Sequence, residues 1–172
     1  KTAMQRLPAL EEVGIQLFFN GPESFTPDDR YLLGPTPEIE NFYVAAGFNS
    51  IGIQSSGGAG KVLADWIVDK APPMDLWDVD IRRMMPFQGN AKYLHDRTVE
   101  GLGLLYAMHW PFSQFESSRP VRTSPLHERL KAKGACFGEA GGWERANWFA
   151  PDGVEPIYEY SYGRQNWFEH SA

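Results

Sequence analysis

The stretch GFNSIGIQSSGGAGKVLADWI, residues 47–67, places a glycine-rich turn directly before an apolar helical pattern. It continues FYVAAGF, residues 42–48, whose aromatic and small apolar residues indicate a strand. After the glycines, apolar residues recur at the spacing of one helical face, at Val62, Leu63, Trp66 and Ile67. The pattern predicts a strand, a tight turn and a helix over residues 42–69, with the helix after Gly57 and with Ser55 and Ser56 as its caps.

Two established uses of glycine turns do not fit this stretch. A phosphate-binding P-loop needs a glycine five residues before the Gly-Lys pair and a hydroxyl residue after the lysine, but Ser55 and Val62 stand there. The spacing of the glycines also differs from the dinucleotide fingerprint. What remains is a helix N-terminus whose unpaired N–H groups suit an electron-rich ligand. Glycines that only let a helix pack closely on a sheet give the same pattern, so both interpretations stay open at this point.

Composition limits the function classes. The chain has 172 residues, 42% of them apolar and 14% aromatic, which is enough for one or two small domains. A net charge of −6 argues against a nucleic-acid partner, which would need a basic surface. The single cysteine, Cys136, fits a reducing compartment and a packing role. No stretch approaches the ~20 apolar residues of a membrane span. Because the sequence does not begin with Met, we expect it to be part of a longer protein.

The sequence pattern changes at a proline-bearing joint, residues 70–83. Before it, GIQLFF at residues 14–19 predicts a further strand, so the first part has the pattern of an α/β unit. Pro72 and Pro73 end the preceding helix, and we expect the residues beyond to pack as a separate subdomain with its own strands.

Three elements are expected beyond the joint. Residues 90–108 have helical apolar spacing interrupted by two glycines, which predicts a helix that frays into an extended end. In residues 123–135, Ser124 suits an N-cap, Pro125 the first helical position and Gly134 the left-handed C-terminal turn. The alternating aromatic and polar residues at 157–172 predict a final strand.

Six motifs in one order resemble the dimethylglycine and sarcosine dehydrogenases, which are flavoproteins. They are NGPESFTPD (20–28), FYVAAGFNSIGIQSSGGAGKVLADWIV (42–68), DLWDVDIRR (75–83), RTSPLHERLKAKGACF (122–137), GWERANWFAP (142–151) and YGRQNWFE (162–169). The resemblance implies an α+β chain in three parts. Residues 1–72 would be the C-terminal βα portion of an FAD-dependent oxidoreductase domain, 73–150 a small mixed α/β central domain, and 151–172 the start of an aminomethyltransferase-like domain. The family's G-x-G-x-x-G motif, which holds the FAD pyrophosphate, does not occur in this sequence, so we expect this stretch to be an internal fragment that is inactive alone.

The resemblance also places the cofactor. In related flavin amine oxidases this turn and the helix after it lie against the flavin ring, and the residues that carry over are Gly47, Phe48, Asn49, Ser50, Ile51, Gly52, Ile53 and Gln54. The positive end of a helix stabilises the negative charge that a flavin gains on reduction, by about 1 kcal/mol. The side chains of Asn49, Ser50 and Gln54 can add hydrogen bonds.

Other polar residues are weaker candidates. Glu23, in the loop before the strand, either sits near a secondary amine or caps a turn, whereas Asp28 fits better as a turn cap. The four histidines lie in different segments without metal-ligand spacing, so no metal site is expected.

Two functions of different class remain. In the first, the whole protein oxidises a small N-methylated amine such as sarcosine or dimethylglycine with FAD, and the C-terminal domain passes the one-carbon unit to tetrahydrofolate. In the second, it is a non-catalytic binding protein, because the regulatory subunit of pyruvate dehydrogenase phosphatase resembles the same architecture. The resemblance implies a bacterial cytoplasmic or mitochondrial matrix location.

Overall fold

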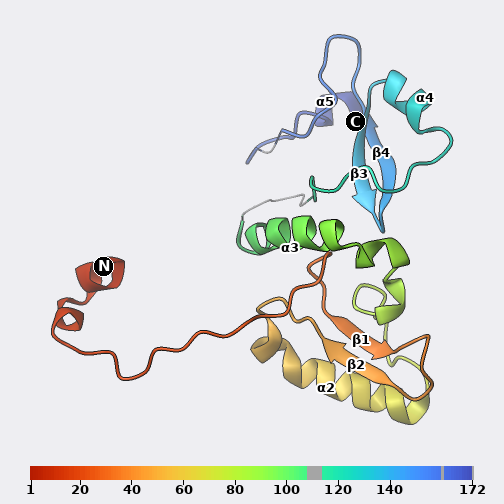
Figure 1. The fold of residues 1–172 in the computed structure, drawn as a ribbon. Helices are drawn as coiled ribbons and strands as arrows, with labels where there is room; N and C mark the ends of the chain where they lie inside the picture. Colours follow the sequence, from red (N-terminus) through yellow and green to blue (C-terminus); the bar gives the residue numbers. More distant parts are fainter. Residues whose placement is uncertain (108–113, 160, 172) are drawn as a thin grey trace.

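The computed structural model describes residues 1–107, 114–159 and 161–171. The chain is α+β, as predicted, with helices and two separate two-stranded sheets. Figure 1 shows one sheet on the long helix α2, the other sheet beside α4, and the helix α3 between them. This arrangement gives the molecule a first unit, a spanning helix and a second unit.

The first unit follows the predicted order of strand, turn and helix. Strand β1 (Leu32–Pro35) pairs antiparallel with β2 (Tyr43–Ala46), and α2 (Gly52–Asp69) packs along this pair (Figure 1). The helix begins at Gly52 and not after Gly57, so the predicted caps Ser55 and Ser56 lie inside it. Three glycines inside the helix lower its intrinsic stability. Burial of the α2 face that carries Trp66 compensates for this loss.

A glycine lets the sheet and the helix approach in the core of this unit. Leu33 and Trp66 are almost fully buried, at 1% and 2% exposure. Gly34 has φ +110°, and a Cβ atom there would lie 2.7 Å from Cη2 of Trp66. The guanidinium carbon of Arg82 lies 5.5 Å from the Trp66 ring centroid. Only glycine suits both this backbone angle and this contact.

After α2, the proline-bearing joint forms a short pairing with the first sheet. Helix α2 ends at Asp69, and Lys70 adopts a left-handed conformation. Val79 then accepts a hydrogen bond from the Leu33 N–H at 2.8 Å, and Asp80 forms a parallel bridge with Leu33. The prediction that everything after residue 73 packs apart from the first sheet is therefore wrong for this short segment, because β1 has an open edge that it can pair with.

Helix α3 (Ala91–Tyr106) follows two 3₁₀ turns, η2 (Ile81–Arg83) and η3 (Pro86–Gly89). Its N-cap is Asn90, whose Oδ1 accepts from the N–H groups of Lys92 and Tyr93. The helix runs unbroken through Gly101 and Gly103, so fraying is not seen up to Tyr106. The last residue of the predicted segment, Met108, lies outside the described residues.

The second unit has a sheet of its own. Strand β3 (Ala135–Ala140) pairs with β4 (Trp143–Phe149) through a two-residue turn in which Gly141 and Gly142 both have positive φ, as a type I′ hairpin requires. As predicted, these strands do not join the first sheet. Helix α4 (His127–Ala132) has Leu126 as its N-cap, so the predicted cap at Ser124 and first position at Pro125 are wrong by two residues. Ser124 Oγ accepts from the Leu126 N–H at 3.2 Å ahead of the helix. Gly134 has φ +77°, as predicted.

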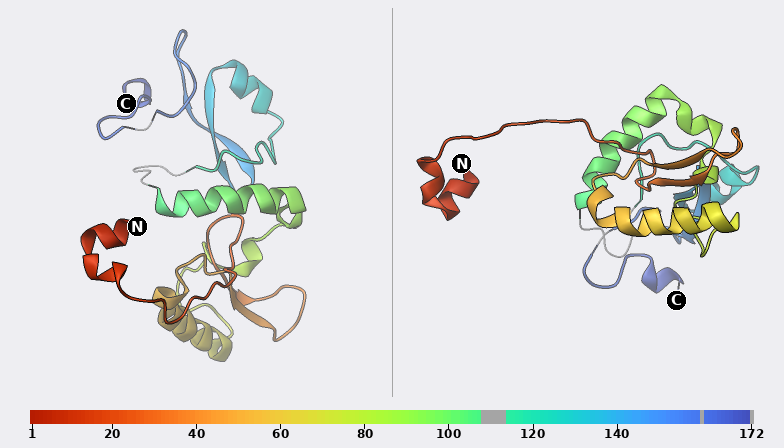
Figure 2. Two further views of the ribbon diagram at one scale, coloured as in Figure 1. Left: turned by 60° about the vertical axis from the view of Figure 1, so that its left-hand side comes forward. Right: turned by 90° about the horizontal axis from the view of Figure 1, so that it is seen from below.

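The two ends of the chain differ from the prediction. Helix α1 (Thr2–Arg6) and turn η1 (Pro8–Glu11) lie on an extended arm away from the body (Figure 2). The strand predicted at 14–19 is wrong, since these residues are exposed and have no strand partner in the part of the chain that the structure describes. The strand predicted at 157–172 is also wrong. Between its described residues, Asn166 Nδ2 bonds the Ile157 carbonyl and closes a loop before α5 (Phe168–Ser171), while Tyr160 and Ala172 lie outside the description.

Candidate functional site

The turn between β2 and α2 uses the left-handed backbone region three times. Gly47, Asn49 and Ser50 have φ of +66°, +47° and +65°. A Cβ atom on Gly47 would also lie 2.6 Å from Cγ2 of Thr26, so this position needs glycine for two reasons. The Ile51 N–H donates to the Phe48 carbonyl at 2.9 Å and closes the turn. The chain thereby reverses from the strand directly into the helix.

Asn49 fastens this turn to the preceding loop, residues 23–30, which we call the strap. Its side chain is buried, at 1% exposure, and Oδ1 accepts from the Thr26 N–H at 2.8 Å. Nδ2 donates to the Gly47 carbonyl at 2.7 Å and to Thr26 Oγ1 at 3.1 Å. The Asn49 N–H donates to the Ser24 carbonyl. Both amide hydrogens of Asn49 are thus used inside the chain, and the residue shapes the turn.

The N-terminus of α2 is open. Its N-cap, Ile51, makes no side-chain capping bond, and no acidic residue stands in the first turn. The first intrahelical bond runs from the Ser55 N–H to the Ile51 carbonyl, so the N–H groups of Gly52, Ile53 and Gln54 have no acceptor within the helix. The Ile53 side chain is 99% exposed. An exposed apolar side chain beside three backbone donors suits a ligand that is flat and apolar with an electron-rich edge.

Glu23 and Ser50, which the sequence places far apart, meet at the edge of the turn. Ser50 Oγ donates to Glu23 Oε2 at 2.6 Å, and both residues are exposed. On the other side Phe48 stacks on Tyr31, with ring centroids 4.7 Å apart. Sequence reasoning missed Thr26 and Tyr31 as members of the site. Thr26 lies within the quoted motif NGPESFTPD, but nothing in that motif indicates its partner.

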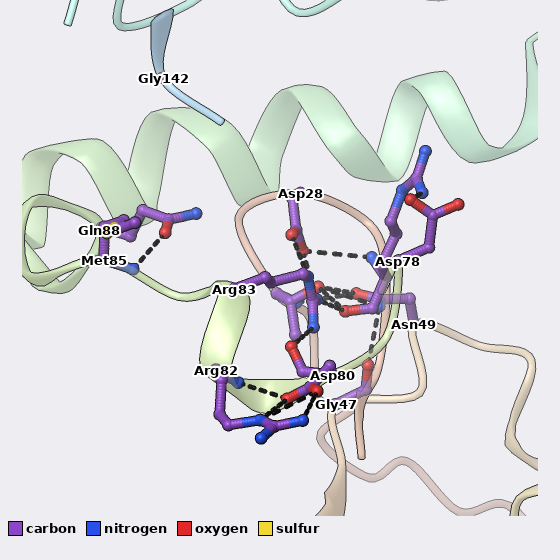
Figure 3. A network of polar contacts seen from close by, with 12 residues as sticks. Asp28, Gly47, Asn49, Asp78, Asp80, Arg82, Arg83, Met85, Gln88 and Gly142 are labelled. Carbon is purple, nitrogen blue, oxygen red and sulfur yellow. Dashed lines mark hydrogen bonds and ion pairs between the residues drawn. The ribbon is translucent and has the colours of Figure 1, made fainter. Parts of the chain in front are cut away.

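The strap is also held from the side of the joint. Arg83 makes a two-bonded ion pair with Asp28, with Nε to Oδ2 at 2.8 Å and Nη2 to Oδ1 at 3.0 Å, and Nη2 also donates to the Arg30 carbonyl at 2.6 Å (Figure 3). Only 8% of the Arg83 side chain is exposed. Asp28 also accepts from the Arg30 N–H, which is the turn-capping role predicted for it. Residues 1–69 and the joint are therefore linked by a largely buried charge pair.

Asp80 and Arg82 form a second pair below this link (Figure 3). Burial acts to raise the pKa of the Asp80 carboxyl, but hydrogen bonds and charge from Arg82 outweigh it and hold the pKa below its usual value. Asp80 Oδ1 also accepts from the Arg82 N–H at 2.8 Å and so caps η2. This pair is structural, because it caps η2 and packs against the first unit, where Arg82 lies over Trp66 and Asp80 bridges to Leu33.

Comparison with known families gives two matches in this chain. Residues 1–66 match the family described as FAD dependent oxidoreductase, and residues 71–124 match the FAD dependent oxidoreductase central domain. The chain belongs to the FAD-dependent oxidoreductase family. Relatives named sarcosine dehydrogenase and dimethylglycine dehydrogenase confirm the resemblance to these enzymes.

Several relatives of this FAD-dependent oxidoreductase align over nearly the whole chain. The 4-methylaminobutanoate oxidase (formaldehyde-forming) of Paenarthrobacter nicotinovorans is 53% identical over 96% of this chain, and human mitochondrial sarcosine dehydrogenase is 40% identical over 93%. The mouse mitochondrial pyruvate dehydrogenase phosphatase regulatory subunit is 36% identical over 96%. The chain spans only 20%, 18% and 19% of the lengths of these relatives.

The open end of α2 fits the FAD that this family uses. A flavin ring has apolar faces and a pyrimidine edge rich in acceptors. The unpaired N–H groups of Gly52, Ile53 and Gln54 match that edge, and the exposed Ile53 side chain matches a ring face. Gly52 adds no side chain to the first turn of the helix. A Cβ atom at this position would already lie 3.4 Å from Cβ of Phe48.

Two further observations concern the residues that the structure describes. Among the described residues there is no group of three or more His, Cys, Asp or Glu side chains that could hold a metal ion, and His109 lies outside them. None of the described helices combines the length and apolar character needed to cross a bilayer.

Proposed function

We propose that this chain forms the flavin-contacting turn and the adjoining central region of an enzyme that oxidises a small N-methylated amino acid with FAD. Support comes from one arrangement: a buried asparagine fixes a left-handed turn that leaves three backbone N–H groups open at the start of an 18-residue helix. Bound FAD would supply the acceptor for a hydride from the N-methyl carbon of the amine, which would become an iminium. The role of this chain is to place donors where negative charge develops.

The cofactor contacts that we propose are those expected from the resemblance, residues 47–54. Backbone N–H groups of Gly52, Ile53 and Gln54 face the pyrimidine edge, and Phe48 and Ile51 lie beside the ring. Asn49 acts through the turn that it holds. Glu23 is a substrate-side candidate, because its carboxylate stands at the mouth of the turn, held by Ser50.

The substrate class follows from the relatives. Their names specify 4-methylaminobutanoate, sarcosine and dimethylglycine, which all carry a methylated amine and a carboxylate. We propose a substrate of this class for the whole protein. Residues 1–72 would be the C-terminal part of its FAD-dependent oxidoreductase domain, 73–150 its central domain and 151–172 only the start of its aminomethyltransferase-like domain. The iminium would pass its one-carbon unit to tetrahydrofolate in the complete C-terminal domain of the whole protein, in the bacterial cytoplasm or the mitochondrial matrix.

The test is flavin content and its reduction in the full-length protein. A yellow protein that bleaches without oxygen on addition of 4-methylaminobutanoate, sarcosine or dimethylglycine supports the proposal. The likeness to the phosphatase regulatory subunit favours a second candidate, a non-catalytic binding protein. A purified full-length protein that is colourless and does not take up added FAD would support that candidate and contradict the first.

Substitution of Gly52 tests the helix terminus itself. Gly52→Val places branched methyl groups against Phe48 and toward the proposed ring, so we expect at least about tenfold weaker FAD binding, measured by titration of the apoprotein. The control is Lys61→Ala, because Lys61 is 75% exposed and pairs only with Asp65 one turn on. Normal binding by Gly52→Val with loss of binding by Lys61→Ala would replace this site with a lysine-centred one.

A further inference from the structure

Asp29 joins the strap to the central helix by an unusually close contact. Its backbone is left-handed, with φ +57°, which turns the carboxyl group toward α3 at Gly101. A Cβ atom on Gly101 would overlap Asp29 Oδ1 and lie 2.8 Å from its Cγ. Gly101 is itself buried, at a position where any other residue would push Asp29 away. A side chain at this position would therefore require the Asp29 carboxyl group to move.

The Asp29 carboxyl group makes this contact without a compensating bond. Its Oδ1 atom is buried and has no hydrogen-bond partner among the described residues. Burial and, to a smaller extent, the nearby carboxylates of Asp28 and Glu100 together raise the pKa of Asp29 to about 6. Neither of the two nearby cations forms an ion pair with Asp29 among the described residues, since Arg83 pairs with Asp28 and Arg97 pairs with Glu139 at 3.1 Å. Protonation removes the charge that makes the contact costly.

The strap connects this contact to the turn. Asp29 is three residues from Thr26, whose N–H donates to Asn49 Oδ1. Between them Pro27 fixes one backbone angle, and Thr26 Oγ1 donates to the Arg30 carbonyl at 2.9 Å, closing the strap into a compact loop. Because the strap is a closed loop, a displacement at Asp29 is transmitted to the Asn49 contact and not absorbed within the strap.

We propose that Asp29 is a positioning residue that registers helix α3 against the strap and thereby sets the placement of the turn at residues 47–50. The consequence for the flavin rests on the proposed function, whereas the mechanical link does not. Loss of a proton from Asp29 weakens the contact that positions α3 against the strap, and a side chain at Gly101 breaks that contact. The central region would in this way control the geometry at the open end of α2.

Two alanine variants of the full-length protein separate this role from a general effect on α3. Gly101→Ala and Gly103→Ala make the same change in helix propensity two residues apart, but a Cβ atom on Gly103 meets nothing within 4 Å. Hydrogen exchange of peptides covering residues 47–54 is the readout. We expect exchange to be faster by roughly tenfold in Gly101→Ala and unchanged in Gly103→Ala. Equal exchange at 47–54 in the two variants overturns the proposal.

The variant Asp29→Asn provides a second test that does not depend on tolerance at Gly101. Exchange at 47–54, corrected for the intrinsic effect of pH, should rise between pH 5 and pH 7 in the wild type and stay level in Asp29→Asn. A pH step that persists in the variant overturns the role of Asp29. Both experiments are run with and without added FAD. Coupling in a protein that never binds FAD would sink the proposed function and leave this inference intact, and FAD binding without coupling would do the reverse.

Discussion

Asn49 shows how one residue can serve a site without facing the ligand. Its side chain satisfies the buried Thr26 N–H from a position 23 residues away in the sequence. In Asn49→Ala that N–H loses its acceptor and the left-handed turn loses its preferred residue, so we expect about 2 kcal/mol less local stability. Native-state hydrogen exchange of peptides at 23–30 in the full-length protein measures this loss. The control is Ser56→Ala, since Ser56 Oγ is exposed and bonds only the Ile53 carbonyl. Equal exchange in both variants would show that Asn49 does not hold the strap.

At the scale of elements, sequence patterns predicted those features that depend on neighbours in the chain. The order of strand, turn and helix over 42–69 and the left-handed turn at Gly134 follow from local spacing and backbone angles. The start of α2 was misplaced because glycine propensity argues against a helix that tertiary packing nevertheless stabilises. Residues 14–19 have strand composition but pair with nothing described. Within the site, the turn was recognisable from its glycines, but the Asn49–Thr26 bonds were not, because no local pattern records a contact across a loop.

Helix α3 holds the segment beyond it through two carboxylates. Asp96 accepts from Ser118 Oγ at 3.1 Å, and the bonds of Glu100 give its contact a pH dependence. Glu100 accepts from the N–H groups of Glu116 at 2.6 Å and Ser117 at 2.8 Å. Burial acts to raise the pKa of Glu100, but these bonds and the charge of Arg97 outweigh it and lower the pKa below its usual 4.5. A carboxyl group with a lowered folded pKa stabilises the fold above its unfolded pKa and loses that effect as pH falls.

We therefore expect the segment at 114–118 to loosen as pH drops below about 4.5, and Glu100→Gln to loosen it at pH 7. Hydrogen exchange of that segment in the full-length protein, corrected for intrinsic rates, measures both effects. Glu38→Gln is the control, because Glu38 is exposed and makes no hydrogen bond or ion pair that the described structure records. Tight exchange protection in Glu100→Gln at pH 7 would contradict the assignment.

At the scale of the whole molecule, two ion pairs lie near the same joint and differ in burial, which makes them a test of what fastens the first unit to the rest. Arg83 pairs with Asp28 through a side chain that is only 8% exposed, whereas Arg30 pairs with Asp78 with side chains 49% and 73% exposed. Removing one partner of a buried pair strands the other charge and costs about 3 kcal/mol, while an exposed pair contributes less than about 1 kcal/mol.

Arg83→Met should accordingly open the joint, and Arg30→Met should leave it closed. Within the joint, residues 70–80 are mostly exposed and make few backbone hydrogen bonds. Limited proteolysis of the full-length protein therefore reports the opening of the joint. We expect cleavage there to be faster by on the order of a hundredfold in Arg83→Met, the change that 3 kcal/mol produces in an opening equilibrium, and near the wild-type rate in Arg30→Met. The strap would lose its hold on the joint at the same time, so weaker FAD binding should accompany the cleavage in Arg83→Met. Equal cleavage in the two variants would mean that β1 pairing at Val79 and the packing of α3, not the buried charge pair, hold the two parts of the molecule together.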